Sequence, residues 1–153
     1  MRQMALLYKT DGNRCRISSN KEARMNALAY TPVKCRALSV KGVPKNEYSD
    51  FIHIIFKFSD KDFAVIAGTS ARTLSRLKPN QNIPQQAAEV TISLMRAYSK
   101  ATEIFGSEEN AVKWLKTPNK VLDGITPVQA MSSRFGAEEV MDILGRIEYG
   151  VYS

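Results

Sequence analysis

The stretch SDKDFAVIAGTSARTLSRL, residues 59–77, decides the fold expected of this chain. Ser59 is followed by two acidic residues within three positions, which is typical of a helix N-cap and first turn. The sequence therefore predicts a short helix over residues 60–67. Gly68 is expected to end that helix, because glycine adopts the left-handed conformation of a helix terminus without steric cost.

A second short helix is expected over residues 71–77, after the turn at Gly68. Ser70 can cap its start, and Leu74 and Leu77 lie three residues apart, so both would face the core. Two short helices joined through a glycine turn and preceded by another helix have the spacing of a helix-turn-helix. The sequence therefore predicts this motif.

The outer face of the second helix is basic and polar. Side chains near the start of a recognition helix reach base edges of DNA, and arginine suits guanine or phosphate. We expect Arg72, Thr73 and Arg76 to make the main contacts. The full set of residues expected to bind DNA is Ser70, Arg72, Thr73, Ser75, Arg76 and Lys78. The alternative is a basic face that contacts solvent only.

Upstream, the sequence predicts one clear helix and a longer region with little regular structure. Apolar residues recur at helical spacing after Pro44, at Tyr48, Phe51, Ile52, Ile55 and Phe56. The segment VKCRALSVKG, residues 33–42, has strand-like residues but no second run to pair with, so we expect it to be extended or irregular. A short helix before it, from Met25, would end at Pro32. Residues 1–41 are thus expected to form a basic, partly irregular N-terminal arm.

Downstream, proline, serine and glycine residues delimit four further helices. The expected helices lie between Pro84 and Gly106, from Ser107 to Leu115, over residues 127–135 and over residues 137–150. Gly136 is expected to end the third of them. No stretch alternates convincingly between apolar and polar residues, so the expected fold class is all-α.

Charge differs between the two ends of the chain. Residues 1–58 carry 11 Lys and Arg against 4 Asp and Glu, whereas residues 101–153 carry 5 against 8. Such asymmetry suggests a polyanion partner for the N-terminal part of the chain and a different partner for the C-terminal part. The alternative is that the charges only keep the protein soluble and are unevenly distributed by chance. We expect a helix-turn-helix DNA-binding bundle over residues 42–100 and a small helical bundle over residues 101–153.

Residues 105–153 also carry a string of short motifs in a fixed order. They are Phe105-Gly106, Ala111, Trp114-Leu115, Pro118-Asn119, Gly124, Thr126-Pro127, Gly136, Val140, Leu144, Ile147 and Gly150. The string resembles the toxin-binding domain of Xre/MbcA/ParS-type antitoxins. Residues 42–77 are similar, more loosely, to the Xre-like helix-turn-helix half of the same proteins.

The resemblance implies the antitoxin of a type II toxin–antitoxin system, which inhibits a cognate toxin and represses its own operon. The toxin would be a RES-domain enzyme that consumes NAD, or a related ADP-ribosyltransferase. The inhibitory element would be the C-terminal end, with residues Arg146, Glu148, Tyr149, Gly150, Val151, Tyr152 and Ser153. Its two tyrosines are of the kind that anchor interfaces, unless they pack back on the bundle. A homodimer or a toxin-bridged hetero-oligomer is expected, because palindromic operators need two readers.

Two other function classes stay open. A plain Xre-like transcriptional regulator would use the C-terminal bundle only to dimerise. A small enzyme would need a catalytic residue set, but His53 stands alone in the apolar run FIHIIF, so we expect no enzyme activity and no cofactor. Cys15 and Cys35 with that single histidine make no zinc site or disulfide framework. We expect reduced thiols, no bound metal, and a cytoplasmic protein without a membrane helix.

Overall fold

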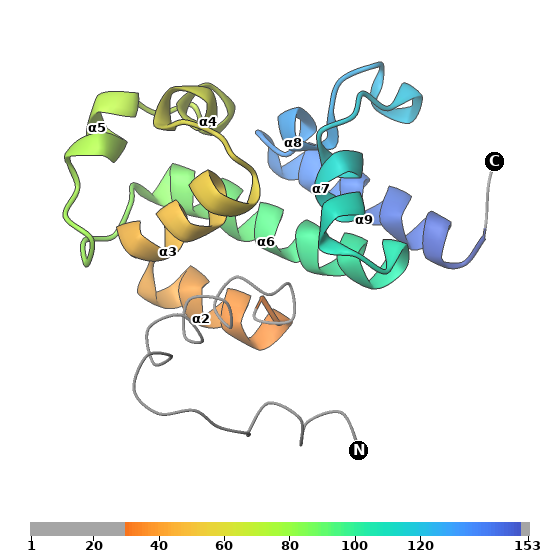
Figure 1. The fold of residues 1–153 in the computed structure, drawn as a ribbon, viewed down its shortest axis with the longest axis horizontal. Coiled ribbons are helices and arrows are strands. Elements are labelled where there is room, and N and C mark those ends of the chain that lie inside the picture. Colours follow the sequence, from red (N-terminus) through yellow and green to blue (C-terminus); the bar gives the residue numbers. More distant parts are fainter. Residues whose placement is uncertain (1–29, 151–153) are drawn as a thin grey trace, which may run out of the picture.

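The computed structural model describes residues 30–150, which form a bundle of helices (Figure 1). The long helix α6, Gln85–Phe105, lies at its centre. Four helices pack against α6, namely α2 (Pro32–Lys41), α4 (Asp60–Ala67), α7 (Glu108–Leu115) and α9 (Arg134–Glu148). The all-α prediction is confirmed, because no strand occurs within these residues. No helix in this part of the chain is long and apolar enough to span a membrane.

The helix predicted after Pro44 is present, but it changes its winding. α3 covers Lys45–Ser49 and continues into a π-helical segment, Asp50–Ile55. The large apolar side chains of this region, Tyr48, Phe51, Ile52 and Phe56, are fully buried. Phe51 contacts the rings of Tyr30, Phe56 and Tyr98 edge-on, so an aromatic cluster joins the π-helical segment to the central helix α6.

The caps predicted for the two short helices are largely confirmed. Ser59 Oγ accepts from the Asp62 backbone N–H, and the Asp62 carboxylate accepts from the Ser59 N–H, which makes a capping box at the start of α4. Gly68 follows in the left-handed region with a φ of 61°. α5 then covers Ala71–Arg76, with Ser70 at its N-cap position but without a side-chain cap hydrogen bond.

The prediction of an extended or irregular segment over residues 33–42 was wrong, because α2 is a helix from Pro32 to Lys41. Thr31 caps it by accepting from the Lys34 N–H. Only Cys35 and Leu38 are buried, so its apolar spacing is too sparse to stand out in the sequence. Packing on α6 stabilises the helix despite the β-branched residues that suggested a strand. The helix predicted from Met25 falls mostly outside the described residues.

The helices α7 and α8 begin at the predicted caps. Gly106 ends α6 with a φ of 72°, and Ser107 Oγ accepts from the Asn110 N–H at the start of α7. A 3-10 helix, Lys120–Leu122, follows, and Thr126 then caps α8, Pro127–Ala130.

Gly136 does not end a helix, which corrects the prediction for residues 127–135. α8 stops at Ala130, and α9 begins at Arg134, so Gly136 lies in the first turn of α9. It is buried, and a Cβ on it would overlap the carbonyl of Ala130. Glycine is therefore required by the close approach of α8 to α9 rather than by a helix terminus.

A single lysine ties α7 to the N-terminal half. Lys116 Nζ donates to the Phe56 carbonyl at 3.1 Å and lies 4.7 Å from the centre of the Phe58 ring. Because the C-terminus of the π-helical segment leaves carbonyls without helical partners, a cation there is favourable. Together with α6, this contact joins the two halves.

Candidate functional site

The residues predicted to bind DNA are all exposed. They are Ser70, Arg72, Thr73, Ser75, Arg76 and Lys78. Neither arginine forms an ion pair within residues 30–150, so both guanidinium groups are available to a ligand. Ser75 Oγ donates to the Arg72 carbonyl at 3.2 Å, which keeps this hydroxyl close to the helix. Leu74 is buried beneath them and Leu77 is partly buried, as expected for the inner face of α5.

An ionic cluster holds α4, and with it the turn to α5, against α3. Asp60 accepts from Tyr48 Oη at 2.9 Å and from Lys45 Nζ at 3.2 Å, and its Oδ1 lies 2.9 Å from His53 Nε2. Burial alone would raise the pKa of Asp60, but the hydrogen bonds from Tyr48, His53 and Lys45 outweigh it and lower that pKa. The carboxylate thus stays charged and fixes the start of α4.

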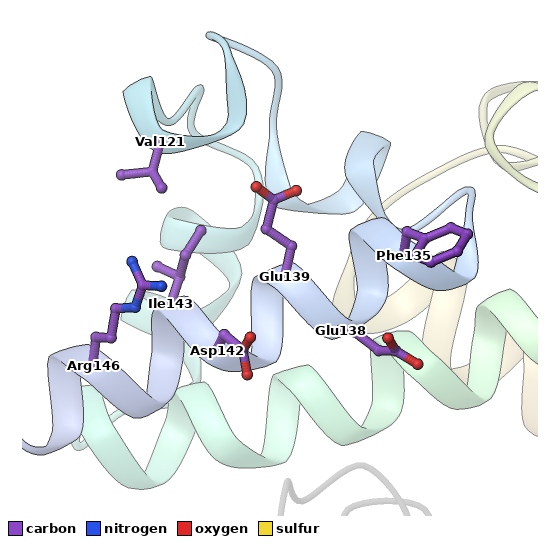
Figure 2. Close-up of a pocket in the computed structure, with 7 residues that line it drawn as sticks. All are labelled: Val121, Phe135, Glu138, Glu139, Asp142, Ile143 and Arg146. Carbon is purple, nitrogen blue, oxygen red and sulfur yellow. The ribbon is translucent and has the colours of Figure 1, made fainter.

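A second candidate site lies on the outer face of α9. A groove of about 350 Å³ is lined by Val121 from the 3-10 helix and by six side chains of α9. The α9 residues are Phe135, Glu138, Glu139, Asp142, Ile143 and Arg146 (Figure 2). Phe135 is 85% exposed, and Tyr149, just past the end of α9, is 80% exposed. The face therefore has an exposed aromatic ring near each end and three carboxylates between them.

Most of this acidic charge has no partner of its own. Glu138 accepts from Arg134 at 3.3 Å, but this pair is exposed and contributes little. Glu139 and Asp142 form no ion pair within residues 30–150. We refer to Phe135, Glu138, Glu139, Asp142, Arg146 and Tyr149 as the α9 face.

The predicted inhibitory tail adjoins the α9 face. Arg146 belongs to both, and Tyr149 and Gly150 follow the helix in exposed positions. Glu148 is held by Lys100 of α6 at 2.6 Å, and this contact raises the pKa of Lys100. The predicted residues Val151, Tyr152 and Ser153 lie outside the described part of the chain.

Four residues of the α9 face were not predicted as site residues from the sequence: Phe135, Glu138, Glu139 and Asp142. Their positions i, i+3, i+4 and i+7 are the available signal, because this spacing places them on one helix face. A helix end was wrongly predicted at Gly136. Phe135 and the acidic residues were therefore assigned to different helices, and their common face was not recognised.

The residues considered for catalysis or metal binding, His53 and Cys35, make contacts that stabilise the fold. His53 Nε2 lies 2.9 Å from Asp60 Oδ1, so this histidine has a structural partner. Cys35 is buried against α6, and burial raises the pKa of its thiol, which lowers its reactivity. Residues 30–150 contain no cluster of three or more His, Cys, Asp and Glu side chains suited to a metal ion.

Residues 30–150 thus present exposed basic residues on α5, and exposed carboxylates flanked by two aromatic rings on and beside α9. Residues 100–150 match the antitoxin Xre/MbcA/ParS C-terminal toxin-binding domain. An antitoxin Xre of Yersinia enterocolitica is 28% identical over 107 residues, covering 68% of this chain and 72% of the relative. An antitoxin Xre of Photorhabdus laumondii is 30% identical over 98 residues, covering 63% of this chain and 66% of the relative.

Residues 100–150 therefore match the Xre/MbcA/ParS toxin-binding domain, and the chain as a whole is similar to the Xre antitoxins. The resemblance found in the sequence is confirmed. The matched segment includes the end of α6, α7, α8 and α9, and so the complete α9 face.

Proposed function

We propose that this protein is an antitoxin that binds and inhibits a toxin protein through the α9 face and the tail that follows it. The observation that carries the proposal is the pair of exposed aromatic side chains, Phe135 and Tyr149, on the toxin-binding domain. Aromatic residues are enriched among the residues that dominate the binding energy of protein interfaces.

The toxin is proposed to be a RES-domain enzyme that consumes NAD, or a related ADP-ribosyltransferase. Support for this chemistry comes from the family resemblance. Tyr149 and Gly150 follow the end of α9, and the C-terminal residues are proposed to reach into the toxin while the α9 face binds beside them. The antitoxin itself supplies no reaction in this proposal, since it acts by occupying the toxin's site.

We also propose that α5 binds operator DNA and that the protein represses its own operon. Arg72 and Arg76 are exposed without ion pairs on a short helix behind a tight glycine turn, as in a helix-turn-helix. Operator and toxin would both be met in the cytoplasm. A homodimer, or a hetero-oligomer bridged by toxin, would present two copies of α5 to a palindromic site.

Co-expression with the product of the neighbouring reading frame tests the antitoxin proposal. The chain is expected to restore growth and to copurify with that product as a stable complex. If growth is not restored and no complex forms, the antitoxin proposal fails, and a regulator whose C-terminal bundle only dimerises takes its place.

Deletion of residues 149–153 tests where inhibition resides. The variant is expected to keep its helical content and thermal unfolding transition, because Tyr149 and Gly150 are exposed and lie past the last turn of α9. The shortened variant is expected to lose its ability to inhibit the toxin. If the shortened chain still protects cells, Tyr149 and the residues after it are dispensable, and inhibition resides on the remaining residues of the α9 face.

A further inference from the structure

α5, the helix proposed to bind DNA, buries little of its own surface. It has 6 residues, which is roughly 1.7 turns, and a helix this short is not stable by itself. Leu74 is its only buried side chain, and Ser70 forms no side-chain cap hydrogen bond at its start. The orientation of α5 therefore depends on how the chain on either side of it is attached.

The loop that follows α5, residues 78–83, is joined to the region where α3 begins. The Lys45 N–H donates to the Gln81 carbonyl at 2.8 Å, and the Ile83 N–H donates to the Val43 carbonyl at 2.9 Å. Ile83 and Val43 are both buried, so little water competes for the second hydrogen bond. The loop is therefore fixed by its backbone as well as by its side chains.

Two side-chain amides complete this junction. Asn82 Nδ2 donates to the Lys41 carbonyl at 2.8 Å. Lys41 is the last residue of α2, so its carbonyl has no partner within the helix. Gln81 Oε1 accepts from the Lys78 N–H at 2.8 Å, two residues past the end of α5. The end of α5 is thus connected through this loop to the end of α2.

Gly42 lies on the α2 side of the same junction. It has a φ of 86°, which residues with a side chain rarely adopt. A Cβ on Gly42 would also overlap the side-chain amide of Asn82. Glycine at this position therefore leaves the space in which Asn82 reaches α2.

Lys45 connects the junction with the start of α4. Its backbone N–H holds Gln81, while its Nζ donates to Asp60 at 3.2 Å. Asp60 is the first residue of α4. The beginning of α4 and the loop after α5 are thus attached to one residue of α3. The relative placement of α4 and α5 therefore depends on residues that belong to neither helix.

We infer that Asn82 is a positioning residue for DNA recognition, which holds α5 at its reading angle through the hydrogen bond to α2. The inference rests on the proposed binding of operator DNA and deepens it, because it gives Asn82 and α2 a part in that binding. Base edges are read by side chains at exact positions in the major groove. Attraction of arginine to phosphate, by contrast, does not depend on base sequence. Loss of the hydrogen bond should therefore reduce sequence preference more than general affinity for DNA.

Hydrogen exchange on the full chain without DNA tests whether Asn82 holds α5. Asn82→Ala should speed exchange of the α5 amides by about fivefold, as expected for one lost hydrogen bond, and leave the α9 amides unchanged. Asn80→Ala is the matched control, because Asn80 lies in the same loop and takes no part in these hydrogen bonds. Exchange of α5 at the wild-type rate in Asn82→Ala overturns the inference.

Binding to a duplex from the promoter of the chain's own gene, and to a shuffled duplex of equal length, tests recognition. Asn82→Ala should reduce the preference for the promoter duplex by about tenfold, the value of one base contact. The slope of log affinity against log salt should stay unchanged, because the phosphate contacts remain. A variant that was merely less folded would bind both duplexes less well and keep the preference. An unchanged preference overturns the inference.

Gly42→Ala tests the junction from the α2 side. It should reproduce both effects of Asn82→Ala, although residue 42 lies outside α4 and α5. Gly124→Ala is the matched control, because Gly124 has a similar φ of 83° but a Cβ there would meet no atom within 4 Å. Circular dichroism checks that each variant keeps its helices. Equal exchange of α5 and equal DNA preference in the two variants overturn the inference.

Failure of the inference is distinguishable from failure of the proposed operator binding. A wild type that does not prefer the promoter duplex contradicts the proposed operator binding. A wild type that prefers it, with an Asn82→Ala variant that prefers it equally, contradicts the inference alone.

Discussion

Gly136 packs directly against the carbonyl group of Ala130, which leaves no space for a side chain at this position. The contact closes the short connection between α8 and α9. Ser133 supports it, because its Oγ accepts from the Gly136 N–H at 3.1 Å as the cap of α9. The direction in which α9 leaves α8 thus depends on one glycine.

Gly136→Ala is expected to destabilise the protein. The added methyl group would overlap the Ala130 carbonyl oxygen, and overpacking of this kind costs about 1–3 kcal/mol. Urea unfolding followed by circular dichroism measures the change. Gly145→Ala is the matched control on the same helix, because a Cβ there meets no atom within 4 Å. Equal stability of the two variants would contradict the proposed packing role.

Asp60→Asn is expected to reduce stability at neutral pH by about 1.5–3 kcal/mol, as for other hydrogen bonds to a charged group. The pKa of Asp60 is lowered in the folded state, so its contribution is complete above the unfolded value of about 4. It declines as the pH falls through the lower, folded pKa. The stability difference between wild type and variant should therefore shrink only below about pH 4.

Thermal unfolding across this pH range measures the effect. Asp142→Asn is the control, because Asp142 is exposed and has no ion pair within the described residues. A difference for Asp60→Asn that stays constant into strong acid would show that the carboxylate contributes through packing and not through charge.

Arg72→Ala combined with Arg76→Ala is expected to weaken operator binding and to flatten its dependence on salt. Each phosphate contact that is lost lowers the slope of log affinity against log salt by about one. Fluorescence anisotropy at several salt concentrations measures it. Lys113→Ala with Lys120→Ala removes two exposed charges from the C-terminal half and serves as the control. An unchanged slope for the arginine pair would remove both residues from the DNA contact.

Phe135→Ala is expected to weaken the complex with the toxin by about 2 kcal/mol, roughly thirtyfold in the dissociation constant. The reason is loss of a large apolar anchor that the folded chain itself does not bury. Isothermal titration calorimetry measures the affinity. Val65→Ala removes an equally exposed apolar side chain from α4 and should change nothing. Unaltered binding by Phe135→Ala would place the toxin contact elsewhere.

Local signals predicted much of the fold. Ser59, Gly68, Gly106, Ser107 and Thr126 act at or beside helix ends as expected, because caps depend on neighbouring residues alone. α2 could not be predicted in this way. Its helix is stabilised by contacts with α6, which lies more than forty residues further along the chain.

The candidate site on α5 was predicted from the sequence, whereas the α9 face was not. The difference again lies between local signals and contacts formed only in the folded chain. The basic face of α5 lies on a single helix whose start was predicted from the sequence, and its basic residues are exposed as expected. The α9 face depends on where α9 begins, which is marked by the Ser133 cap. Gly136 was instead interpreted as a helix end, because its close approach to Ala130 cannot be seen in the sequence. A close approach between two elements leaves no mark in the sequence except the glycine, and a glycine suits a helix end equally well.

The central position of α6 has a consequence for how such proteins diversify. α6 passes through residue 100, where the sequence suggested a domain boundary, and packs against α2 and α4 as well as α7 and α9. Recombination between related genes at that point would join the first half of α6 from one protein to the second half from another. The contacts that α6 makes with α2, α4, α7 and α9 would then have to be compatible. New toxin specificity is therefore expected to arise by substitutions on the surface of α9 more readily than by exchange of the whole C-terminal third.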